Sequence, residues 1–106
     1  MVSIEDFKKF EFVVAEVKEA KAHPNADRLL VLQINIGDED RQLVAGIKAS
    51  YEPEALIGKK IVIIKNLEPA TIRGEESQGM LLAATGDNGP IILTPEQDVP
   101  AGSRVG

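Results

Sequence analysis

The chain has 106 residues and a mass of 11.4 kDa, which predicts one domain over residues 1–106 that buries about 65% of its unfolded surface. Its composition, 43% apolar and 27% charged, excludes disordered, collagenous and low-complexity chains. The net charge of −5 argues against extended contact with nucleic acid, because phosphate contacts need clustered Lys and Arg. Any positive patch must therefore be assembled from separate segments in three dimensions.

The rare residue types exclude several kinds of site. There is no Cys and a single His, so disulfides, zinc sites and thiol chemistry are not expected, and neither a metal nor a cofactor is predicted. Apolar runs such as Ile61 to Ile64 are far too short to span a membrane, and the first residues lack a signal-peptide pattern. We therefore expect a cytoplasmic location and no membrane partner.

The first half of the chain predicts a capped helical turn followed by three strands. Ser3 precedes Asp6 by three residues, which is typical of a helix N-cap. Apolar residues then alternate with polar ones over residues 11–21 and again over 30–36, and strand 41–45 follows a Gly-Asp turn. Strands 30–36 and 41–45 form a predicted hairpin.

The second half of the chain predicts one short helix and three more strands. Pro53 and Gly58 bracket the helix, because Pro favours the first turn and Gly follows the last. The strands are expected at residues 60–65, 80–84 and 90–93. Five main strands with a short helix between the third and fourth are typical of the OB-fold, a mainly all-β, five-stranded Greek-key barrel, here with terminal extensions. Its usual ligand face is flanked by two loops, here residues 22–28 and the irregular stretch 66–79.

Three motifs resemble one known family. They are HPNADRLL at 23–30, LVAGIKASYEPEALIGKKIV at 43–62 and GEESQGMLLAA at 74–84. The sequences of these motifs, their order and their spacing resemble those of the dimeric tRNA-binding domain family. This family includes the C-terminal domain or β subunit of methionyl-tRNA synthetases, free-standing structure-specific tRNA-binding proteins and EMAP-II-like domains. The resemblance implies noncatalytic binding of the tRNA elbow and homodimerisation, with the synthetase catalytic chain as a further partner.

The resemblance also implies a set of RNA-binding residues in the two loops and between them. By the family pattern these are Asn25, Arg28, Lys48, Arg73, Ser77 and Met80. Five of them have a structural alternative: Arg28 and Lys48 are ordinary solvated charges, Asn25 and Ser77 form turns, and Met80 is a core residue. Glu75 departs from the family, which usually has an apolar residue there. His23 is interpreted only as a loop residue.

Charge and aromatic content constrain how RNA would be bound. Neither loop contains an aromatic residue, which favours recognition of a folded RNA over base stacking with a single strand. Only four cations are expected near the loops, namely Arg28, Lys48, Lys65 and Arg73. So few phosphate contacts predict weak binding by one chain, and a homodimer would double them.

The N-terminal segment offers a surface for such a dimer. Ile4, Phe7 and Phe10 form an apolar stripe at helical spacing outside the barrel, and the final segment 91–105 is predicted to contribute. The alternative is that the stripe covers the open end of the barrel.

The sequence leaves a second function open, namely binding of proteins instead of RNA. A secretion-related chaperone branch of the same family binds proteins, and the net acidity of this chain suits that role. No nucleophile elbow or phosphate-binding loop is present, so no enzyme activity is predicted. Met1 permits a complete free-standing protein, and an excised synthetase domain remains the alternative.

Overall fold

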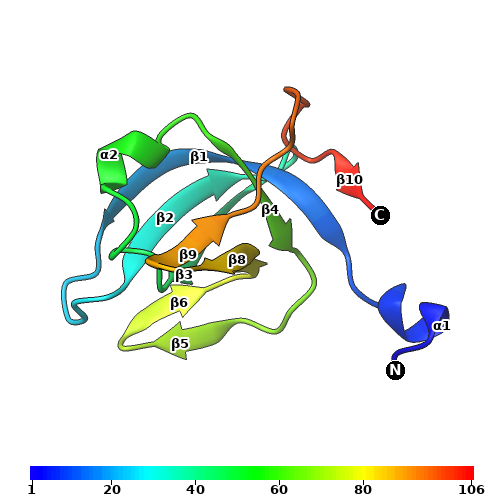
Figure 1. Ribbon diagram of the computed structural model, residues 1–106, viewed down its shortest axis with the longest axis horizontal. Helices are drawn as coiled ribbons and strands as arrows, with labels where there is room; N and C mark the ends of the chain where they lie inside the picture. The colour runs from blue at the N-terminus through cyan, green and yellow to red at the C-terminus, as the bar shows by residue number, and fades with distance from the viewer.

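One long strand organises a curled antiparallel sheet (Figure 1). The computed structural model describes residues 1–106. In chain order its elements are α1 (Ile4–Phe7), β1 (Phe12–Ala22), β2 (Leu30–Asn35), β3 (Asp40–Ala45), α2 (Pro53–Leu56), β4 (Lys60–Ile64), β5 (Ala70–Ile72), β6 (Glu75–Ser77), β7 (Met80–Leu81), β8 (Ala83–Gly86), β9 (Gly89–Ile92) and β10 (Arg104–Val105).

The sheet closes into the predicted OB-type barrel. Its strand order is β3-β2-β1-β4-β7, and β3 and β7, at the two ends of that order, come into contact. The seam between them is supported at Gln78, whose backbone N–H donates to the Gln42 carbonyl at 2.8 Å. The predicted short helix, α2, lies between β3 and β4. The fold prediction is confirmed.

The core follows from the alternation along the strands. Val13, Ala15 and Val17 of β1 face inward, as period-2 alternation requires. They pack in one apolar cluster with residues of the other barrel strands and with Leu56, which α2 inserts fully buried. Because α2 begins at Pro53 and Gly58 follows it with φ of +90°, the Pro-start, Gly-stop prediction is confirmed.

Two predictions about the second half of the chain need correction, and one strand was not predicted. Residues 66–79 are not irregular, since β5 and β6 form a hairpin there with Arg73 and Gly74 at its turn. The strand predicted at 80–84 is divided: β7 pairs with β4, and β8 forms a separate hairpin with β9. The C-terminal segment also contributes β10, which pairs with Phe12 and Val13 at the start of β1.

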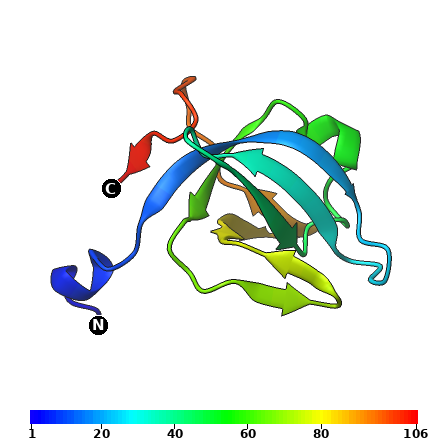
Figure 2. The same cartoon turned by 180° about the vertical axis from the view of Figure 1, so that it is seen from behind.

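The N-terminal helix stands apart from the barrel (Figures 1 and 2). The predicted cap is present, since Ser3 Oγ accepts from the Asp6 backbone N–H at 3.1 Å. None of the residues of α1 is buried. The total exposed surface, 6841 Å², exceeds by about 1,000 Å² the value of ~5,800 Å² that surface scaling predicts for this mass. Neither helix is long and apolar enough to cross a membrane.

Candidate nucleic-acid interface

The loop between β1 and β2 lies against the turn of the β5–β6 hairpin, and both ribbon views show the two side by side (Figures 1 and 2). The loop is closed on itself by the His23 backbone N–H, which donates to the Leu29 carbonyl at 3.0 Å. It is tied to the hairpin by Arg73, whose Nη2 donates to the Asn25 carbonyl at 3.2 Å. The predicted residues Asn25, Arg28 and Arg73 therefore border one hollow of about 350 Å³.

A third segment joins these two beside Arg28. Lys48 follows β3, and its backbone N–H donates to the Arg28 carbonyl at 3.4 Å. Asn25, Arg28, Lys48 and Arg73 come from three separate stretches of the sequence, and the fold brings them to the same end of the molecule. All four are exposed.

The three cations at this end are free of ion pairs. The ion pairs of the structure lie elsewhere and join Lys9 to Asp6, Lys18 to Glu16, Arg41 to Glu39 and Lys60 to Asp98. Arg28, Lys48 and Arg73 have no carboxylate within ion-pair distance, although Asp27 lines the same hollow as Arg28 and Arg73. Three exposed cations against this one carboxylate still attract phosphate groups.

Arg73 has an unusual backbone conformation. It is the only residue other than glycine with a positive φ, at +53°, and Gly74 follows with φ of +93°. Two consecutive positive φ values match the tight two-residue turn that joins twisted strands. Such turns usually have Asn, Asp or Gly at the first position, because a side chain in this conformation is strained. Arg73 therefore occupies a position at which Asn, Asp or Gly would adopt the required backbone conformation at lower energetic cost.

The other two predicted residues are placed differently. Ser77 is 4% exposed, and its hydroxyl accepts from the Val44 backbone N–H and donates to the Gly79 carbonyl, each at 3.0 Å. This is the structural alternative that the sequence left open, and the hydroxyl has no free donor for RNA. Met80, in contrast, is 51% exposed, so the core alternative was wrong for that residue.

Lys65 does not join the cluster. It lines a different hollow together with Glu39 and Glu68, and its carbonyl accepts from Arg41 Nη1 at 2.6 Å. Carboxylates of this neighbourhood reduce its attraction for phosphate. Of the four cations expected near the two loops, three therefore form the cluster, and Lys65 lines a separate hollow.

His23 is a part of the site that the sequence reasoning missed. The side chain is only 5% exposed, and its two ring nitrogens make hydrogen bonds to two different segments. The signal available in the sequence was a polar ring two residues before an Asn inside a turn, a spacing at which side chains bond to the backbone. Its second partner, 49 residues away, has no local signal.

Comparison with known proteins decides the family. The model of the family described as "Putative tRNA binding domain" matches residues 12–104. This chain belongs to the tRNA-binding domain family. The predicted family is thus confirmed.

The relatives of this tRNA-binding domain include proteins that are much longer and proteins of about the same length. It is 53% identical over 105 residues to the methionine–tRNA ligase of Methanococcus aeolicus, a match that covers 99% of this chain and 16% of the ligase. Among solved structures, a MetRS-related protein from Pyrococcus horikoshii has a TM-score of 0.91 at 36% identity, covering 99% of this chain and 97% of that one. The CsaA chaperone protein of Picrophilus torridus has a TM-score of 0.93 at 28% identity, covering both chains completely.

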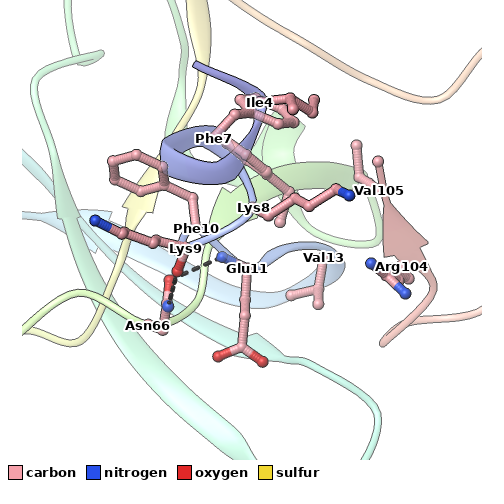
Figure 3. Close-up of a pocket in the computed structure, with 12 residues that line it drawn as sticks. Ile4, Phe7, Lys8, Lys9, Phe10, Glu11, Val13, Asn66, Arg104 and Val105 are labelled. Carbon is pink, nitrogen blue, oxygen red and sulfur yellow. Dashed lines mark hydrogen bonds between the residues drawn. The ribbon is translucent and has the colours of Figure 1, made fainter. Parts of the chain in front are cut away.

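The tRNA-binding domain has a second exposed feature at the end opposite the β1–β2 loop (Figure 1), and Figure 3 shows the residues that line it. Ile4, Phe7 and Phe10 are 58%, 43% and 45% exposed, and with Val105 they border a hollow of about 780 Å³ between α1 and β10. The stripe does not cover the barrel, so that alternative was wrong. Asn66 fixes the segment that carries α1, because its side chain accepts from the Glu11 N–H and donates to the Lys9 carbonyl.

Proposed function

We propose that this domain binds folded tRNA without catalysing a reaction, and that Arg28, Lys48 and Arg73 contact its phosphates. The observation that carries this proposal is the cluster of three exposed cations without ion pairs, contributed by three segments. Exposed Asn25 adds an amide beside them, and Met80 offers an apolar contact on β7. Neither of the two loops contains an aromatic residue, which favours recognition through phosphates and shape.

The strength of binding by one chain follows from the number of contacts. Three phosphate contacts with a salt slope of about 0.8 each predict a loss of affinity of about 30-fold between 50 and 200 mM salt. A dimer that applies two such clusters to one RNA would lose about 800-fold over the same range. The slope of tRNA affinity against salt concentration therefore indicates whether one or two clusters contact each tRNA.

A titration with three ligands tests the function. Total tRNA, a single-stranded oligonucleotide and an unfolded polypeptide are added separately to the labelled domain, and binding is followed by fluorescence anisotropy. We expect micromolar affinity for tRNA and weaker binding of the oligonucleotide. Preference for the polypeptide would instead support the chaperone function, which the similarity to CsaA keeps as the second candidate.

We further propose that the whole of residues 1–106 acts in the cytoplasm as one RNA-binding unit of a methionyl-tRNA synthetase. The match to the ligase of Methanococcus aeolicus supports this. Tethering to the catalytic chain would raise the effective concentration of tRNA at that chain. In an aminoacylation assay, the synthetase with this domain attached should have a lower KM for tRNA than the catalytic chain alone. Equal KM values would contradict the proposal.

The proposed oligomer is a homodimer formed through the terminal surface, which we define as Ile4, Phe7, Phe10 and Val105. This surface lies at the end of the molecule away from the β1–β2 loop (Figure 1), so a second copy there would leave the RNA-binding cluster free. Burying its aromatic rings would contribute favourable hydrophobic free energy.

Sedimentation equilibrium tests the dimer. The wild-type mass should correspond to two chains, and Phe7→Ser should shift it to one. Ile57→Ser is the matched control, because Ile57 is 52% exposed and lies outside the terminal surface. A wild-type monomer, or a control that dissociates equally, would refute this interface.

A further inference from the structure

His23 sits between the two segments that carry the proposed RNA-binding cations. Its Nε2 lies 3.0 Å from the carbonyl oxygen of Ile72, the last residue of β5. Its Nδ1 accepts from the backbone N–H of Asn25 at 2.9 Å. One buried ring thus contacts both the β1–β2 loop and the β5–β6 hairpin.

These partners determine the protonation state of the ring. A backbone N–H can only donate, so Nδ1 must carry a lone pair, and a carbonyl can only accept, so Nε2 must carry the proton. The imidazole is therefore neutral, in the Nε2–H tautomer. Either the other tautomer or the doubly protonated ring would lose the bond to Asn25.

The hydrogen bonds form a closed circuit. From His23 the path leads to Ile72, along the chain to Arg73, from its guanidinium to the Asn25 carbonyl, and from the Asn25 N–H back to His23. The backbone of Asn25 is therefore held on both sides. Three residues further along the loop, Arg28 borders the same hollow as Arg73.

From this circuit we infer that His23 is a positioning residue for tRNA binding. It links the loop to the hairpin and so holds Arg73 at a fixed place relative to Arg28 before RNA arrives. Arg73 uses one of the five N–H groups of its guanidinium for Asn25, and the others are free for phosphates. Preorganised contacts of this kind avoid the entropic cost of ordering a long side chain on binding. The inference rests on the proposed tRNA binding.

Two substitutions separate the two hydrogen bonds of the ring. In His23→Asn, the amide oxygen replaces the Nδ1 acceptor and the side chain is too short to reach Ile72. In His23→Gln, the amide nitrogen replaces the Nε2 donor, which retains the link between the segments. We expect His23→Asn to weaken tRNA binding about sixfold at 0.1 M salt, the effect of losing one phosphate contact. His23→Gln should stay within about twofold of the wild type.

A double-mutant cycle distinguishes positioning from a general structural role. In the Arg73→Ala background there is no guanidinium to position, so adding His23→Asn should change tRNA affinity less than twofold. If His23→Asn weakens binding equally in both backgrounds, or has no effect in the wild type, the inference is wrong. Circular dichroism of each variant shows whether it is folded.

A measurement on the wild-type protein keeps the inference testable if His23→Asn does not fold. Long-range ¹H–¹⁵N correlation spectra report the tautomer of the single imidazole, and we expect the Nε2–H form with and without tRNA. The Nδ1–H form, or a change of tautomer on adding tRNA, would overturn the inference. If the wild type does not bind tRNA at all, the proposed function fails, whereas the tautomer still reports whether the circuit exists.

Discussion

Replacing Arg73 by either Ala or Gly separates the contribution of its side chain from the cost of its backbone conformation. Both variants lose the hydrogen bond to the Asn25 carbonyl and the proposed phosphate contact. They differ at φ of +53°, which Gly adopts freely and Ala does not. A residue with a Cβ in this region is destabilised by about 1 kcal/mol or slightly more.

The stability difference converts into a measurable shift. For a domain of 106 residues, about 1 kcal/mol corresponds to a difference in Tm of about 4–5 °C. Arg73→Gly should therefore melt about 4–5 °C above Arg73→Ala in a thermal unfolding experiment followed by circular dichroism. In fluorescence anisotropy, both variants should bind tRNA about sixfold more weakly than the wild type at 0.1 M salt and almost equally at 1 M.

Two results would refute this reasoning. If Arg73→Ala were as stable as Arg73→Gly, the turn would not impose the positive φ in solution. If either variant bound tRNA as tightly as the wild type, the guanidinium would not be a phosphate contact, and the reason for an arginine at this strained position would have to lie elsewhere.

Three further predictions address single side chains. Lys48→Ala should weaken binding of all tRNA species alike and lower the salt slope by about one. The matched control is Lys59→Ala, which removes an exposed lysine outside the cluster and should leave anisotropy titrations unchanged. A loss of affinity that differs between tRNA species would argue against phosphate contact. Glu75→Val should tighten tRNA binding slightly, because it removes a carboxylate from the hairpin beside Arg73; weaker binding in the same titration would show that the carboxylate has another use. Ser77→Ala leaves a buried backbone N–H of β3 without its acceptor. We therefore expect the free energy of unfolding in urea to fall by about 2 kcal/mol, while the folded variant keeps its tRNA affinity. An unchanged midpoint of the urea transition would contradict this.

The sequence by itself determined the barrel. Alternation over residues 11–21 predicted a strand with Val13, Ala15 and Val17 on one face, which is the face that packs in the core, and Pro53 with Gly58 located α2. These signals are local, because side-chain direction in a strand and backbone preference in a turn depend on residues only a few positions apart. The family was also predicted, through motifs that are contiguous in the sequence. Asn25, Arg28 and Lys48 lie within those motifs, and Arg73 immediately precedes the third.

Only the tertiary structure decided how the loops are built and joined. The β5–β6 hairpin was missed because its turn has an arginine where Asn or Gly would signal a tight turn. For Ser77 and Met80 the sequence left both a binding role and a structural role open, and the structure buries Ser77 and exposes Met80, since burial depends on which strands lie nearby. His23 gained its role from a carbonyl 49 residues away. Hydrogen bonds between such distant segments leave no periodic pattern in the sequence, so the site could be predicted as a set of residues but not as an arrangement.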